Sequence, residues 1–95
     1  MSLLRSCLFF TSLVVAHPAL AGASDARDAG RELYEDLCIS CHGEGARGEP
    51  GAGSDIRGSI ARQVTMAIGG GYEDMPAVEL TDDEIAALVA YLDSL

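Results

Sequence analysis

The chain contains no lysine and no tryptophan, and its 95 residues include only three cysteines and two histidines. Its cations are six arginines, which stand against fifteen acidic residues and leave a formal net charge of −9 at pH 7. Binding to nucleic acid or to an anionic membrane needs a basic surface, so the composition argues against both partners. An acidic surface favours solubility, and the alternative is docking to a partner with a basic patch.

A run of apolar residues long enough to span a membrane is also absent. The uncharged apolar stretch at residues 8–16 has about nine residues, whereas a transmembrane helix needs about twenty. Arg5 precedes the stretch, and the sequence ALA at 19–21 follows it with the pattern that signal peptidases recognise. We therefore predict that residues 1–21 are a removed signal peptide, with cleavage after Ala23 as the second choice. An uncleaved N-terminal tether is the weaker alternative.

Export would leave residues 22–95 as one small domain in the periplasm. All fifteen acidic residues and five of the six arginines lie in it, so its formal charge is −10. A domain of this length buries a limited core and often needs a disulfide, a metal or a large cofactor. Only two cysteines remain after residue 21, Cys38 and Cys41. They could form a disulfide in an exported protein, or they could attach another group.

Residues 25–38 have the spacing of an amphipathic helix, because small and apolar residues recur there at helical intervals between charged ones. These residues are Gly30, Leu33, Tyr34 and Leu37. Residues 43–58 hold six glycines and Pro50, which is typical of a loop.

Two more helices are predicted in the second half of the chain. Ser59 is placed to cap a short helix that ends at glycines 69–71. Its apolar stripe is Ile60, Val64 and Ile68. Thr81 and Glu84 have the spacing of a capping box at the start of the last helix. Its apolar stripe is Ile85, Leu88, Leu92 and Leu95, widened by Val89 and Tyr91. No segment alternates as strands do, so the predicted fold class is all-α.

The residues Cys38-Ile39-Ser40-Cys41-His42 form the sequence C-x-x-C-H, through which c-type haem is attached. In a helical turn, positions i, i+3 and i+4 share one face, so the two thiols and the imidazole can point the same way. The thiols can then meet the two vinyl groups of one porphyrin, and the histidine can meet its iron. We predict one covalently bound haem c, which would also give this short chain a core.

Three other roles for the two cysteines fit the sequence less well. A thiol–disulfide site normally opens a helix beside a strand, whereas Cys38 and Cys41 close a helix and no strand precedes them. A structural zinc site needs four ligands, and only two cysteines and His42 remain after the leader. A plain disulfide leaves the adjacent His42 unexplained. Haem attachment is therefore favoured.

Met75 is the candidate for the second axial ligand of the iron. It lies in a loop before Pro76 and just ahead of the last helix, where a role as core filler is a poor explanation. Met66 is the rival, but it lies inside a helix, where lateral packing explains it better. Ligation by methionine and histidine is how the iron of cytochromes c is held.

With these residues in order, the chain resembles a class I cytochrome c of the short bacterial monohaem type. The resemblance covers residues 25–95 and rests on Gly30 with Tyr34, on CISCH followed by Gly43, on Met75-Pro76, and on Tyr91 in the last helix. It implies three to four short helices wrapped around one covalently bound haem.

The resemblance also implies the role of further residues. In the family the first and last helices cross where a glycine meets an aromatic residue, and Gly30 and Tyr91 match those positions. A proline carbonyl accepts a hydrogen bond from the axial histidine, and Pro50 is the candidate here. Relatives often place a tryptophan against a haem propionate. This chain has none, and Arg57 or Arg62 is a candidate substitute, although surface solvation explains either equally well.

The function implied is one-electron transfer in the periplasm, because filled axial positions leave the iron no place for a substrate. The chain would be an electron-transfer protein and not an enzyme, either diffusible or the small cytochrome subunit of a dehydrogenase. Redox proteins are the expected partners, among them a periplasmic dehydrogenase or a terminal oxidase. The absence of lysine excludes the lysine ring that mitochondrial relatives use for docking. The alternative is a haem-based ligand-binding or sensor protein with an open or labile sixth iron position.

Overall fold

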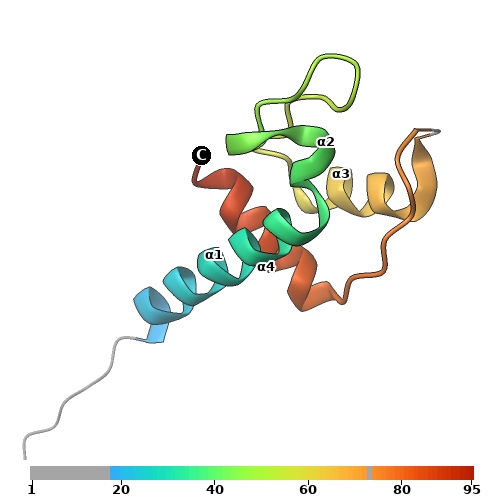
Figure 1. The fold of residues 1–95 in the computed structure, drawn as a ribbon. Coiled ribbons are helices and arrows are strands. Elements are labelled where there is room, and N and C mark those ends of the chain that lie inside the picture. Colours follow the sequence, from blue (N-terminus) through green and yellow to red (C-terminus); the bar gives the residue numbers. More distant parts are fainter. Residues whose placement is uncertain (1–17, 73) are drawn as a thin grey trace, which may run out of the picture.

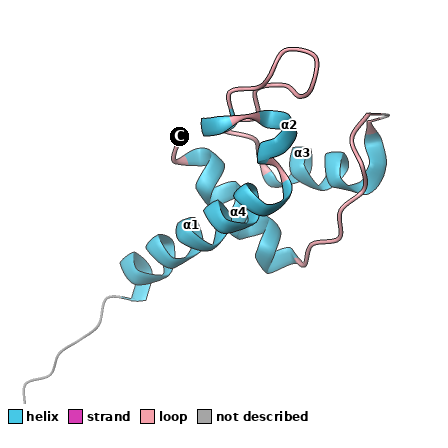
Figure 2. Ribbon diagram, in the orientation of Figure 1, coloured by secondary structure: helices cyan, strands magenta, loops and turns pink. Residues whose placement is uncertain are grey.

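The computed structural model describes residues 18–72 and 74–95, and these residues form helices connected by loops, with no β-strand among them (Figures 1 and 2). The elements in chain order are α1 (Pro18–Leu37), α2 (Ile39–His42), the 3-10 turn η1 (Glu44–Ala46), α3 (Ala61–Met66), the π-helical turn η2 (Ala67–Gly71) and α4 (Asp82–Asp93). The sole bridge among these residues joins Glu49 to Gly53 inside a loop. The all-α prediction is confirmed.

Helix α1 begins at Pro18, which is earlier than the predicted start at residue 25, and it ends at Leu37. The apolar stretch of the predicted leader lies outside the described residues. Both predicted cleavage positions, Ala21 and Ala23, lie in the first turns of α1. None of the helices in the described part of the chain is long and apolar enough to cross a membrane.

The crossing of α1 and α4 organises the core (Figure 1). Gly30 is buried at the crossing, and a Cβ atom there would lie 2.0 Å from the carbonyl oxygen of Ala87 and 2.9 Å from Cβ of Tyr91. One turn later Tyr34 packs against Tyr91, with ring centroids 5.6 Å apart. A side chain at residue 30 would separate the helices, so the predicted crossing is confirmed.

The predicted capping box begins α4. The Thr81 side chain accepts a hydrogen bond from the Glu84 amide at 3.1 Å, and the Glu84 carboxylate accepts one from the Thr81 amide at 2.8 Å. The helix buries the apolar face predicted for it, namely Ile85, Leu88 and Leu92. Leu95 is 46% exposed, because α4 ends at Asp93 and the stripe does not extend to the last residue.

The start of α3 differs from the prediction by one residue. Ile60 occupies the N-cap, and its amide donates to the Gln63 side-chain oxygen at 2.9 Å. The Ser59 hydroxyl donates to the Ile56 carbonyl at 2.7 Å, so Ser59 does not cap the helix. Because Ile60 is at the cap, its side chain is 55% exposed, while Val64 and Ile68 are buried as predicted.

Candidate haem site

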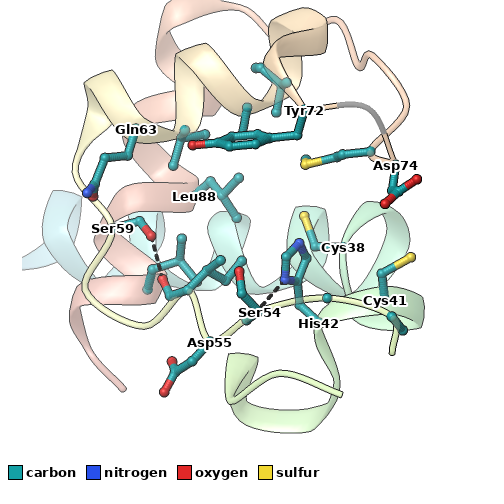
Figure 3. A pocket seen from close by; sticks show the side chains of 18 of the residues that line it. Cys38, Cys41, His42, Ser54, Asp55, Ser59, Gln63, Tyr72, Asp74 and Leu88 are labelled. Carbon is teal, nitrogen blue, oxygen red and sulfur yellow. Dashed lines mark hydrogen bonds between the residues drawn. The ribbon is translucent and has the colours of Figure 1, made fainter. Parts of the chain in front are cut away.

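A cavity of about 540 Å³ lies between α2, α3, η2 and α4, and its walls are mainly apolar (Figure 3). All four residues singled out in the sequence line it: Cys38, Cys41, His42 and Met75. Core residues Val64, Ile68, Leu88 and Leu92 also line it. The helical core therefore borders a cavity whose wall carries sulfur and nitrogen atoms that can bind a metal or a cofactor.

The turn that carries the cysteines is helical, as the spacing predicts. The His42 amide donates to the Cys38 carbonyl at 3.0 Å, and the Gly43 amide donates to the Ile39 carbonyl at 2.9 Å. Cys38, Cys41 and His42 therefore share one side of the cavity (Figure 3). Cys38 is half-buried and Cys41 exposed, and neither forms a disulfide. Burial, and to a smaller extent the neighbouring Cys41, raises the pKa of the Cys38 thiol.

The imidazole of His42 is 9% exposed, and its Nδ1 lies 2.7 Å from the Ser54 carbonyl oxygen. A carbonyl can only accept, so Nδ1 is the donor, and in the neutral imidazole the lone pair is then on Nε2. The prediction of Pro50 as the acceptor is wrong. Pro50 is exposed in the turn between Glu49 and Gly53, which are joined by a backbone bridge, and the carbonyl that the ring meets is that of Ser54.

Gly53 lets the loop pass directly against the attachment turn. A Cβ atom at this position would lie 2.6 Å from the Cys41 carbonyl oxygen and 2.9 Å from His42 Nδ1. Both distances are below van der Waals contact, so only glycine allows the Ser54 carbonyl its position. Ser54 and Gly53 were not identified from the sequence, where the only signal was the density of glycines in residues 43–58.

Met75 lies in the loop that connects η2 to α4. It is half-buried against the core and lines the cavity. The loop is held by hydrogen bonds from the Met75 amide to the Tyr72 carbonyl at 3.2 Å and from the Val78 amide to the Ile68 carbonyl at 2.9 Å. Met66 is 57% exposed and does not line the cavity. Of the two methionines, Met75 is the one near His42 and the cysteines.

A model of the family described as cytochrome c oxidase, cbb3-type, subunit III matches residues 25–92. The chain belongs to this cytochrome c family. No curated protein and no solved structure matches the chain significantly. The cofactor of the family is covalently bound haem c, so this cytochrome domain is a haem c protein and its role is electron transfer.

The donor groups of the cytochrome domain fit that cofactor. Two unbridged thiols lie three residues apart on one wall, beside an imidazole whose Nε2 is available. A thioether also lines the cavity, and the remaining wall is largely apolar. Among residues 18–72 and 74–95, no group of three or more His, Cys, Asp or Glu side chains is arranged to hold a metal ion by itself.

Tyr34 ties both ends of the attachment turn of the cytochrome domain to α1. Its backbone carbonyl accepts from the Cys38 amide at 2.8 Å, and its hydroxyl donates to the Gly43 carbonyl. The side chain is 1% exposed, and burial, followed by the proximity of Cys38 and Tyr91, raises its pKa to about 12. The sequence indicated Tyr34 as a core residue only, because the contact of its hydroxyl depends on the loop.

The two arginines considered for the haem propionates do not line the cavity. Arg57 instead binds the Asp55 carboxylate through Nε at 3.0 Å and a terminal nitrogen at 2.6 Å. These hydrogen bonds, with one from the Arg57 amide, lower the pKa of Asp55 to about 2. Arg62 is exposed on α3. Neither arginine is therefore placed to contact the haem propionates.

Proposed function

We propose that the chain is a periplasmic one-electron carrier in which Cys38 and Cys41 hold the haem through thioether bonds. His42 and Met75 are then the axial ligands of the iron. The observation that carries the proposal is that these four side chains, three from residues 38–42 and one from the distant loop at Met75, line one cavity in a cytochrome c domain. Once bound, the haem supplies a one-electron couple.

The chain's own residues then set the properties of that couple. The Ser54 carbonyl orients the His42 ring and increases the basicity of its Nε2 through the bond at Nδ1. The apolar lining lowers the local dielectric constant, and a thioether from Met75 favours the reduced state. The exposure of Cys41 supports electron exchange at the edge of the haem nearest to it.

The proposal includes export and a redox partner. Residues 1–21 would be removed as a signal peptide, which leaves the packed part of α1, from Gly30 onward, intact. The matching family model is described by a subunit of a terminal oxidase, which supports an oxidase as partner. A periplasmic dehydrogenase remains the other candidate, with the chain acting as a diffusible carrier or as a subunit.

The first test is the absorption spectrum of the protein exported in a host that attaches haem, recorded oxidised and reduced. A low-spin c-type spectrum with the weak far-red sulfur–iron band supports both axial ligands. A colourless protein contradicts the proposal. A high-spin spectrum with strong binding of carbon monoxide contradicts Met75 ligation and favours the ligand-binding alternative.

Met75→Ala tests the second axial ligand, with Met66→Ala as the matched control. The Met75 variant should lose the far-red band and bind carbon monoxide when reduced. The Met66 variant should keep the wild-type spectrum, because Met66 is largely exposed and outside the cavity. Loss of the band in the Met66 variant alone would reverse the assignment.

A further inference from the structure

The two ends of the cavity differ in chemistry. A haem carries two vinyl groups on one edge and two propionate carboxylates on the opposite edge. If Cys38 and Cys41 hold the vinyl edge, the propionates lie at the other end of the cavity. In Figure 3 that end is lined by Ser59 and Gln63, on the side away from both cysteines. This inference rests on the proposed function.

The end near Ser59 and Gln63 has no arginine to meet two carboxylates. Arg57 is held by both oxygens of Asp55 and is absent from the lining, as is Arg62. Asp55 is among the lining residues, but its carboxylate is an acceptor only. A carboxylate in a partly enclosed site needs hydrogen-bond donors, and the donors that the protein offers at this end are neutral.

Of Ser59 and Gln63, Gln63 is the side chain with a donor to spare; the hydroxyl of Tyr72, which also lines the cavity, is a further neutral donor. The Ser59 hydroxyl donates to the Ile56 carbonyl at 2.7 Å, which uses its one proton. The Gln63 oxygen accepts from the Ile60 amide at 2.9 Å, and this bond fixes which end of the amide is oxygen. Its Nε2 carries two N–H groups, and none of the described residues accepts from them in a recorded hydrogen bond.

We propose that Gln63 binds the haem propionates by donating hydrogen bonds from Nε2. The same side chain thus has two tasks: its oxygen caps α3, and its nitrogen positions the cofactor. The role that relatives give to a tryptophan is then performed by an amide on the first turn of α3. Gln63 is a positioning residue toward the haem and has no part in its covalent attachment.

Two substitutions separate the two tasks. Gln63→Glu keeps an oxygen for the Ile60 amide and removes the donor, whereas Gln63→Met removes both at similar size. The readout is the propionate bending band in resonance Raman spectra of the haem-loaded protein, which reports hydrogen bonding to the carboxylates. We expect the band of both variants to shift toward its position for propionates that contact only water.

The midpoint potential is the second readout, with Thr65→Glu as the control. Gln63→Glu should lower the potential, because a negative charge beside the propionates stabilises the oxidised haem. Thr65 is exposed on α3 and does not line the cavity, so the same charge there should shift the potential less and leave the Raman band unchanged.

An unchanged Raman band in both Gln63 variants overturns the proposal. A shift in Gln63→Met without one in Gln63→Glu also overturns it, because the lost cap of α3 would then be the cause. Either result would come from a protein with a normal low-spin haem spectrum. A failure of the proposed function would instead appear as a colourless or high-spin wild type.

Discussion

His42 obtains its hydrogen-bond acceptor from Ser54, twelve residues further along the chain, at a distance of 2.7 Å. The contact depends on the absence of a side chain at Gly53, where a Cβ atom would lie 2.9 Å from His42 Nδ1. A ligand that is oriented by a backbone carbonyl is insensitive to the identity of the residue that supplies it. It is sensitive to anything that moves that backbone.

Gly53→Ala should therefore act on His42. The methyl group would overlap the Cys41 carbonyl, so the loop must shift and the bond from Nδ1 must lengthen. We expect a loss of about 1–3 kcal/mol in the free energy of unfolding and a changed midpoint potential. Thermal unfolding and redox titration measure the two effects. Gly69→Ala is the control, since a Cβ atom there meets nothing within 4 Å and should change neither quantity.

Tyr34 carries the second prediction at the scale of the residue. Tyr34→Phe keeps the ring against Tyr91 and leaves the Gly43 carbonyl without its phenol donor. Loss of one partner of a buried hydrogen bond costs about 1–3 kcal/mol, and urea unfolding at neutral pH should show it. Tyr91→Phe makes the same chemical change in the facing ring. If both variants lose the same free energy of unfolding, the hydrogen bond to the Gly43 carbonyl is not the cause of the loss.

The pH dependence of stability follows from the same hydroxyl. The folded state raises the pKa of Tyr34 from 10.0 to about 12, so it favours the neutral phenol. This contribution is complete below pH 10 and is lost as the pH rises from there through 12. Urea midpoints measured across that window should fall in the wild type and fall less in Tyr34→Phe. The chain has no lysine, so no ammonium group titrates in the same window.

At the scale of the element, the crossing of α1 and α4 depends on Gly30. Gly30→Val should separate the helices, because even its Cβ atom would lie 2.0 Å from the Ala87 carbonyl oxygen. We expect a loss of about 1–3 kcal/mol or more and a clear fall in melting temperature. Ala29→Val places the same side chain on the exposed neighbouring position. If Gly30→Val and Ala29→Val have the same melting temperature, close packing at Gly30 does not stabilise the core.

The elements that could be predicted from the sequence are those fixed by local rules. The i, i+3 and i+4 spacing places Cys38, Cys41 and His42 on one face, and the capping box of Thr81 begins α4 where predicted. The loop between His42 and α3 follows no such rule. Its path is set by distant backbone bonds, such as the 2.9 Å contact of the Ile56 amide with the Ala46 carbonyl. The sequence therefore predicts Pro50 as the acceptor for His42, whereas the structure has the Ser54 carbonyl there.

In the first turn of α3, a shift of one residue in the predicted start of the helix changes the role expected for Gln63. With Ser59 as cap, Gln63 would be an ordinary surface residue in the second turn. With Ile60 as cap, Gln63 occupies the third helical position, and its oxygen is bound to the Ile60 amide at 2.9 Å. The propionate role proposed for Gln63 follows from this register. The sequence could not show it, because Ser59 is the better capping residue by composition.

At the scale of the whole molecule, charge is the dominant property. Removal of residues 1–21 leaves a formal charge of −10, and the acidic residues extend from Asp25 to Asp93. One of the five arginines of that domain, Arg57, is paired with Asp55 at 2.6 Å. If the haem is bound as proposed, this net negative charge should attract cationic redox partners over distances set by the ionic strength.

Small inorganic oxidants test this without a known partner. Oxidation of the reduced protein by the cation tris(1,10-phenanthroline)cobalt(III) should be accelerated at low salt, and oxidation by the anion ferricyanide should be slowed. Rising salt should slow the first reaction and speed the second, because the Debye length falls from about 30 Å at 0.01 M to about 3 Å at 1 M. Stopped-flow rates over that range measure both trends. If neither rate depends on salt, the acidic residues act on solubility alone, and a basic docking patch on the partner is no longer required.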